Sequence, residues 1–194
     1  MALMLVAAVC VLAVGCKKNA GENAASIGKG EVAIYAVIDH NELVQRLSSS
    51  SEAADLLQLL GENEYYVSDD TATVNAMIVQ AGLSGDVRSG WIVRRDMMPE
   101  LVFYGAQPLL VETAPIIAVK PLPDADDVQV TFALSEQDKW QEITATNLGK
   151  RLAIIANGHL VNAPLVSAPI ETGVLTILLP KDRIATVFPG LERD

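Results

Sequence analysis

Aromatic side chains, histidines and cysteines are scarce in this chain, and basic side chains are outnumbered. Phe, Trp and Tyr make up 5% of the 194 residues, and there are two histidines and two cysteines. Aromatic platforms that stack on bases are therefore not expected. The 14 Lys and Arg face 24 Asp and Glu, for a net charge of −10. This balance excludes a polybasic nucleic-acid binder, because neutralising phosphates requires clustered Lys and Arg.

The first 15 residues, MALMLVAAVCVLAVG, carry no charged side chain. A membrane-spanning helix needs about 20 apolar residues, so this run is better suited to the apolar region of a signal peptide. It ends in Leu12 to Gly15, then Cys16 and two lysines, although no Lys or Arg precedes it. This end resembles the cleavage box of bacterial lipoproteins, which implies cleavage before Cys16 and a lipid on its thiol. A plain signal peptide or an uncleaved anchor is the alternative.

The resemblance to bacterial lipoproteins indicates what happens to the two cysteines and where in the cell the chain is expected. Cys10 would leave with the signal peptide and Cys16 would be acylated, so disulfides, thiol catalysis and cysteine zinc sites are excluded. Residues 16–30 are rich in Gly, Ala and Asn and are expected to form a flexible tether. We therefore expect a bacterial envelope protein that contacts the membrane through Cys16 and faces the periplasm. Lys17 is not the Asp that retains some such lipoproteins at the inner membrane, which slightly favours the outer membrane.

The remaining chain predicts an α+β fold, with a mixed or antiparallel sheet and helices packed on one face. Its first part, residues 31–115, is expected to be a smaller α/β subdomain. It contains a strand at 31–38, helices starting after Asp39, Ser51 and Asp70, and strands at 91–95 and 101–104. The third helix would turn Val74, Met77, Ile78 and Ala81 inward. Four prolines then predict an irregular connector: Pro108, Pro115, Pro121 and Pro123.

The second part, residues 116–194, gives clearer signals. Apolar and polar residues alternate through 128–134, which predicts a half-buried strand. A helix is expected from Ser135, with an inward stripe of Trp140, Ile143, Thr144 and Leu148. Asn157-Gly158 lies between two apolar runs and predicts a tight hairpin turn, since both turn positions need positive φ. Further strands are expected to include Leu160-Val161 and Val174 to Leu179, with a closing helix at 181–188.

The stretch from Val128 to about Ile177 resembles the head subdomain of the first periplasmic domain of SecD and SecDF, which are protein-export accessory proteins. The matching positions are Asn147, Gly149, Lys150, Leu152 to Ile155, Asn157-Gly158, Asn162 to Pro164, and Pro169-Ile170. Weaker matches precede the head at Thr73–Met77 and Leu101–Pro108. The family's second glycine and Gly-x-Phe element after Pro-Ile are missing here. The resemblance implies a SecD-head-like fold and contact with exported polypeptide or with translocase or envelope proteins. The proton coupling of the family's membrane helices is not carried over.

No constellation in the sequence points to an enzyme, a metal site or a cofactor. Asp39 and His40 lie near Ser48–Ser51, so a hydrolase is conceivable, but Asp39 is better used as a helix cap and no Gly-x-Ser-x-Gly elbow exists. Asp124, Asp126 and Asp127 lack the further ligands of a calcium loop. The glycines at 82, 85 and 90 do not have phosphate-binding spacing.

The expected functional surface is a rim around the hairpin tip and the two Ala-Pro segments. Its candidate partner-binding residues are Asn157, Gly158, His159, Asn162, Pro164 and Pro169. An extended peptide could add to a sheet edge there through backbone hydrogen bonds. The prolines could equally serve only to block an edge strand against aggregation. Function is therefore predicted as binding of polypeptide or an envelope partner, which would include assisting protein export. A structural lipoprotein with one dedicated partner is the second hypothesis. Met97-Met98 would add a soft contact patch if exposed.

Overall fold

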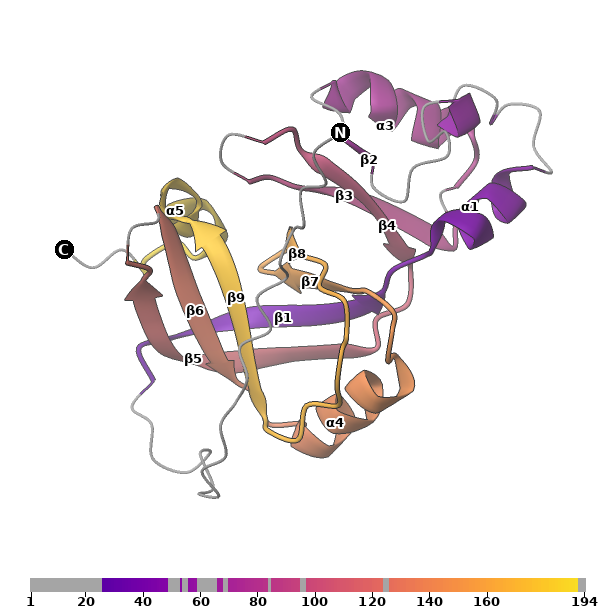
Figure 1. Cartoon of the computed structure of the whole chain (residues 1–194). Helices are drawn as coiled ribbons and strands as arrows, with labels where there is room; N and C mark the ends of the chain where they lie inside the picture. The colour runs from indigo at the N-terminus through magenta and orange to yellow at the C-terminus, as the bar shows by residue number, and fades with distance from the viewer. Residues whose placement is uncertain are drawn as a thin grey trace, which may run out of the picture.

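The computed structural model of this chain describes residues 26–48, 53, 56–58, 66–67, 70–83, 85–94, 97–123 and 126–191. The expected signal peptide, Cys16, residues 17–25 of the expected tether and the start of the helix expected after Ser51 lie outside these residues. The described part is an α+β fold built on two antiparallel sheets (Figure 1). The expected fold class is confirmed.

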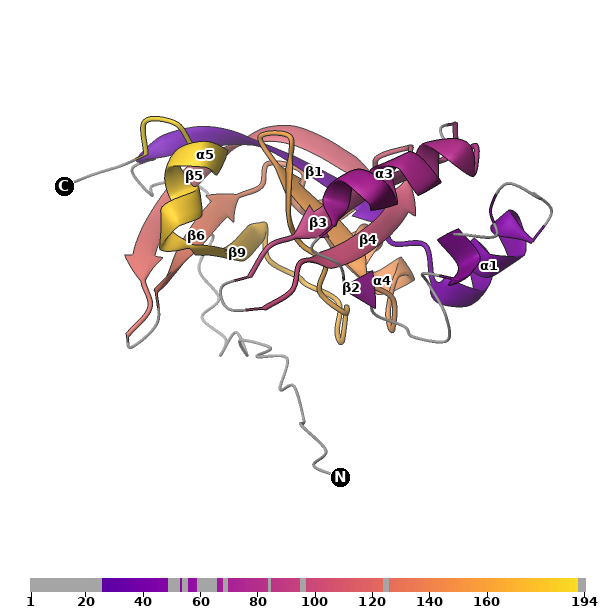
Figure 2. The same ribbon diagram turned by 90° about the horizontal axis from the view of Figure 1, so that it is seen from above.

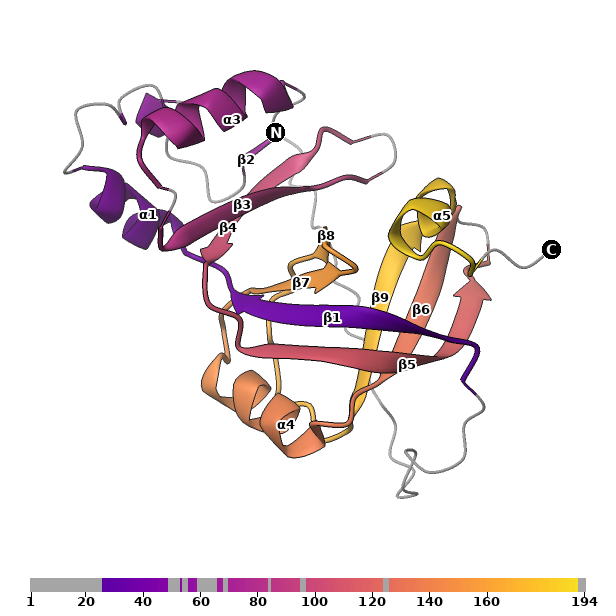
Figure 3. The same cartoon turned by 180° about the vertical axis from the view of Figure 1, so that it is seen from behind.

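The larger sheet has six strands in the order β8-β7-β1-β5-β6-β9. Its strands are β1 (Gly28–Ala36), β5 (Leu110–Pro121), β6 (Asp127–Ala133), β7 (Leu152–Ala156), β8 (His159–Asn162) and β9 (Val174–Pro180). β1 is the first strand in the chain, but it lies in the middle of the sheet and pairs with β5 and β7 (Figure 3). The two outer strands, β8 and β9, approach each other without forming a ladder, so the sheet is strongly curled.

The proline-rich connector expected between the two halves is wrong, because most of it is the 12-residue strand β5. β5 pairs with β1 up to Ile116 and with β6 from Ile116 onward, with an irregularity in the register between Ile116 and Ala118. Pro115 lies opposite Lys29 in the register. The carbonyl of Glu31 accepts the N–H of Asn157 on the β7 side, and Lys29 lies two residues before Glu31, so the backbone groups of Lys29 also point away from β5. The missing N–H of Pro115 therefore faces an edge where no strand pairs, and the ladder tolerates it.

One face of the six-stranded sheet carries the main core. Helix α4 (Gln137–Thr146), the short helix η2 (Lys181–Arg183) and helix α5 (Ile184–Val187) contribute to this side of the molecule. Trp140 and Ile143 of α4, and Val187 with the following Phe188, pack in the same cluster as the inward side chains of the strands. Leu148, expected on the inward stripe, is 49% exposed because α4 ends before it and Gly149 turns the chain with φ +74°.

The start of α4 also differs from the expectation. The residue before the helix is Glu136, not Ser135, and no side chain of the helix caps its own first turn. The carboxylate of Glu112 on β5 instead binds the two backbone N–H groups that immediately precede the helix. It accepts the backbone N–H of Ser135 at 2.9 Å and that of Glu136 at 3.3 Å. A residue of a neighbouring strand therefore stabilises the positive end of the helix dipole.

The smaller sheet has the order β2-β4-β3, formed by β2 (Tyr66–Val67), β3 (Val87–Ile92) and β4 (Glu100–Gly105). Helices α1 (His40–Leu47) and α3 (Thr71–Gln80) cover one face of it, through a cluster that includes Leu43, Val74 and Phe103. Its other face packs on β1, β7 and β8 through a third cluster. The two sheets thus lie between α1 and α3 on one side and α4 on the other (Figure 1). Seen from above, α1 and α5 lie toward opposite ends of the molecule (Figure 2).

Helix α1 begins as predicted: the Asp39 carboxylate accepts the N–H of Glu42 at 2.8 Å. The chain between β1 and α1 joins the sheets, because the N–H of Ile38 donates to the carbonyl of Phe103. The expected subdomains, 31–115 and 116–194, do not coincide with the two sheets. β1 belongs to the larger sheet, and the boundary at 115 falls inside β5.

Candidate functional site: the Asn157–Pro169 rim

The turn between β7 and β8 forms as predicted, with φ of +45° at Asn157 and +81° at Gly158. The Asn157 side chain is committed to holding this turn in place. Its Oδ1 accepts the N–H of Glu31 at 2.8 Å, and its Nδ2 donates to the carbonyl of Val187 at 2.8 Å. The N–H of Asn157 also donates to the carbonyl of Glu31. Asn157 thus connects β1, β7 and the end of α5, and it has little left to offer a ligand.

The next rim residues belong to β8. His159 is the first residue of β8 and is half-buried. Leu160 packs against the Cα of Gly90 on β3, where a Cβ would lie 3.1 Å from a Leu160 methyl carbon. Asn162 is half-buried, and its Oδ1 accepts the N–H of Ala163 at 2.9 Å. The hairpin half of the rim is therefore built mainly for packing between the two sheets.

The Pro164–Pro169 half of the rim is more exposed. Pro164, Leu165, Ser167, Ala168 and Pro169 are all exposed, and Leu165 is 56% exposed. Backbone hydrogen bonds anchor the segment to residues 150 and 152. The N–H of Leu152 donates to the carbonyl of Pro164, and the N–H of Val166 donates to the carbonyl of Lys150.

This bonding pattern sets the direction of the Leu165 backbone. The hydrogen bonds flank the bridge between Arg151 and Leu165, so these two residues form a non-hydrogen-bonded pair. The N–H and carbonyl of Leu165 consequently point away from β7. They lie beside an exposed leucine side chain and between two prolines.

A buried ion cluster holds the rim against the smaller sheet. Glu100, the first residue of β4, is 7% exposed. Its carboxylate contacts Nη2 of Arg151 at 2.5 Å and Nη2 of Arg94 at 3.3 Å. Arg151 also donates from Nε to the carbonyl of Ala163 at 2.7 Å. Arg151 is the more buried partner at 19% exposure, whereas Arg94 is 45% exposed, so losing Arg151 would leave the buried carboxylate with a contact at the surface only. The sequence carries no local signal for this cluster, because its members are far apart in the chain.

Of the catalytic alternative at Asp39, His40 and Ser48–Ser51, the structure describes Asp39, His40 and Ser48. The Asp39 carboxylate caps α1, and the Ser48 hydroxyl donates to the carbonyl of Val44. Ser49 to Ser51 and Asp124 lie outside the described residues. In the part of the chain that the structure describes, no group of three or more His, Cys, Asp or Glu could hold a metal ion.

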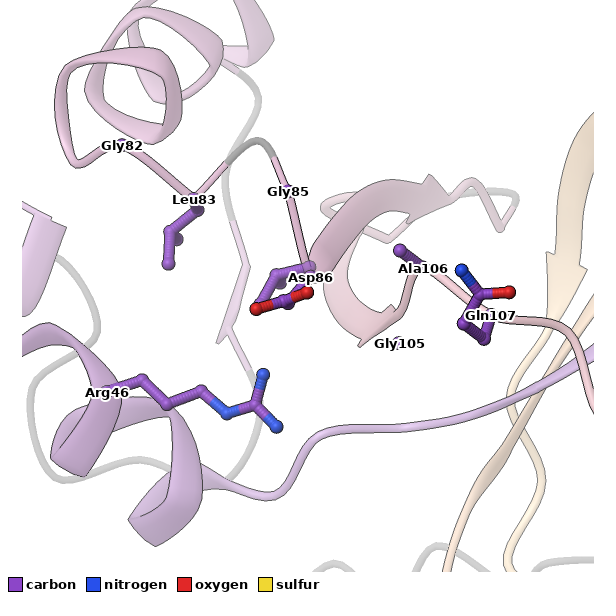
Figure 4. A pocket seen from close by; sticks show the side chains of 9 residues that line it. Arg46, Gly82, Leu83, Gly85, Asp86, Gly105, Ala106 and Gln107 are labelled. Atoms are coloured by element: carbon purple, nitrogen blue, oxygen red, sulfur yellow. The ribbon is translucent and has the colours of Figure 1, made fainter.

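A cavity of about 680 Å³ opens between α1, the turn after α3 and the end of β4 (Figure 4). Arg46 reaches toward it from α1, and Asp86 and Gln107 line the opposite side, with glycines between them. Sequence reasoning did not single out this cavity. Among its described lining residues, the side chains with polar groups are those of Arg46, Asp86 and Gln107.

Two adjacent methionines lie on the surface between β3 and β4. Met97 and Met98 are 60% and 52% exposed, which fulfils the condition of exposure for a soft contact patch there. None of the helices described here is long and apolar enough to span a membrane.

Comparison with known proteins gives matches only among solved structures. No family model and no curated protein matches this chain. One similar structure is described as a membrane component, SecDF, that enhances protein export. It shares 16% identity over 76% of this chain and 84% of its own, with a TM-score of 0.30. A SecDF in a super-membrane-facing form and a translocon-associated SecDF from Thermus thermophilus share 18% and 15% identity. Each covers 76% of this chain and 26% of its own, with TM-scores of 0.31 and 0.27. At these TM-scores the similarity assigns neither a family nor a function to this chain.

Proposed function

We propose that this chain is a non-catalytic, lipid-anchored protein of the bacterial envelope that binds an extended polypeptide at its rim. The outward N–H and carbonyl of Leu165, together with its exposed side chain, carry the proposal. Backbone groups at an edge recognise any extended chain, and one apolar side chain beside them adds affinity without strict sequence selection. Exported polypeptide in the periplasm is the client that fits such recognition.

The rim is held firmly enough to serve as a binding surface. Val166 is buried and anchors the segment, while its N–H and carbonyl bond to residues 149 and 150. Arg151 and Glu100 fix the other end at Ala163. A pre-organised edge loses less conformational entropy on binding than a mobile loop would. Leu148, 49% exposed in the loop that bonds to Val166, extends the apolar surface.

A second candidate function is a structural lipoprotein with one dedicated partner. The Pro164 and Pro169 flanks support it, because prolines beside an exposed edge prevent open-ended strand pairing. The same surface would then bind one shape-matched protein. The two functions differ in the number of proteins captured, and this difference can be measured directly.

The experiment is photo-crosslinking in living cells, with a probe at Leu165, a second at His159 and a control at Gln45 on the exposed face of α1. A broad distribution of adducts at Leu165, absent at Gln45, is expected for a polypeptide-binding rim. One discrete adduct would establish the dedicated-partner function instead. Equal or no labelling at the three positions would reject the rim. For the anchor, Cys16→Ser is expected to release the protein from the membrane fraction.

A further inference from the structure

The loop between β3 and β4 carries three exposed apolar side chains. Val93, Met97 and Met98 are 42%, 60% and 52% exposed, and we call them the methionine tip. β3 and β4 project past the end of α3 to reach this loop (Figure 1). Residues 95 and 96 of the loop lie outside the described residues. Unbranched, polarisable methionine side chains adapt to apolar groups of different shapes, so the tip has the chemistry of an unselective apolar contact.

An ion pair closes the base of the loop. Ile92, the last residue of β3, lies opposite Glu100, the first residue of β4. Arg94 follows β3, and its Nη2 lies 3.3 Å from Oε2 of Glu100. The methionine tip is therefore joined at its base to the buried carboxylate of Glu100.

The other oxygen of the same carboxylate leads to the rim. Oε1 of Glu100 accepts from Nη2 of Arg151 at 2.5 Å, and Arg151 lies opposite Leu165 in an antiparallel bridge. Directly opposed residues of an antiparallel pair point their side chains to the same face. Leu165 consequently lies beside Arg151, on the face of the larger sheet that meets the smaller sheet.

The rim and the methionine tip leave the contact between the sheets at the same end. Leu160 of β8 packs on Gly90 of β3. Three residues later, the carbonyl of Ala163 accepts Nε of Arg151, whose guanidinium contacts Glu100 at the start of β4. β8 and β3 therefore progress in the same direction, and the rim follows β8 where the methionine tip follows β3.

We propose that the methionine tip and Leu165 form one continuous surface for an extended polypeptide, with the cluster of Arg94, Glu100 and Arg151 between them. This inference rests on the proposed function and adds the class of client. The client is a segment with apolar side chains at two places along its length, one against Leu165 and one against the methionines. A second contact on the same segment strengthens binding, because the first contact already holds the segment nearby.

The test is photo-crosslinking of the full chain in living cells, with probes at Leu165 and, separately, at Met98. Both probes are expected to capture the same set of polypeptides, and each contact is expected to depend on the other. Met97→Asp combined with Met98→Asp should lower adducts at Leu165 several-fold, and Leu165→Asp should lower those at Met98 several-fold.

The matched control is Val79→Asp, which places the same charge on another exposed apolar position. Val79 is 77% exposed on α3, which covers the face of the smaller sheet that points away from the larger sheet. This variant is expected to leave both sets of adducts unchanged. Urea unfolding checks that every variant remains folded.

The outcomes separate this inference from the proposed function. Adducts at Leu165 that persist in the methionine variant, or that fall equally with Val79→Asp, overturn the continuous surface and leave the rim function standing. A crosslink from Met98 to another part of the same chain also overturns it, because the tip would then be covered within the molecule. If Leu165 itself captures nothing, the proposed function fails, and this inference fails with it.

Discussion

Substitutions at Asn157 would show how far one side chain holds the candidate site together. Asn157→Ala removes two side-chain hydrogen bonds of 2.8 Å, to Glu31 and Val187, each worth about 1 kcal/mol. It also places alanine at φ +45°, where a Cβ residue without a local polar group costs about 1 kcal/mol or more. We expect the free energy of unfolding to fall by about 3 kcal/mol, and Tm by about 6–12 °C.

Two companion variants separate these contributions. Asn157→Gly keeps the positive φ without strain but loses both hydrogen bonds, so a loss of about 2 kcal/mol is expected. Gly158→Ala keeps both bonds and adds only the strain of φ +81°, since nothing lies within 4 Å of the new Cβ. Urea unfolding followed by circular dichroism measures all three. If the free energy of unfolding of Asn157→Ala lies within about 0.5 kcal/mol of that of the unsubstituted chain, the structural role assigned to the Asn157 side chain is refuted.

Three further predictions concern other parts of the molecule. Glu112→Ala is expected to cost about 1–2 kcal/mol in urea unfolding, because α4 loses the carboxylate that caps it; Glu112→Gln, which keeps one acceptor oxygen, is the control and should cost less. Burial raises the pKa of Tyr104 above its ordinary value in the folded protein. The contribution of the neutral Tyr104 side chain to the free energy of unfolding is therefore complete below about pH 10 and is lost as the pH rises through the pKa of the folded state. Tyr104→Phe should therefore flatten the alkaline fall in unfolding free energy, and an unchanged fall would contradict this origin. Leu165→Asp is expected to weaken adduct formation at His159 while changing stability by less than about 0.5 kcal/mol, as is usual for an exposed side chain.

Local patterns in the sequence predicted the elements whose causes are local. The alternation in 128–134 and the Asn157-Gly158 turn depend on neighbouring residues, and both strand and turn form as expected. The cap at Asp39 is equally local. Periodicity and turn chemistry therefore account for most of the second half of the fold.

The features that the sequence did not predict depend on distant partners. β5 contains prolines, and only its change of partner at Ile116 explains why Pro115 is tolerated. Glu112 caps a helix from another strand, and Arg151 bonds to Glu100 across the two sheets. Of the candidate rim, the sequence predicted the hairpin turn at Asn157-Gly158. The structural role of Asn157 was not, because its two side-chain partners are far away in the chain.

The central position of β1 has a consequence for the order in which this chain can fold during its synthesis. The N–H of Glu31 bonds to a residue 126 positions later in the chain. Since the chain emerges amino end first, β1 must wait with both edges open until β5 and then β7 have been made. Closing such a long loop costs conformational entropy before native contacts form, so the pairing of β1 with β7 is slow. The edge of the first strand that pairs with β7 therefore stays uncovered until residues 152–156 are available.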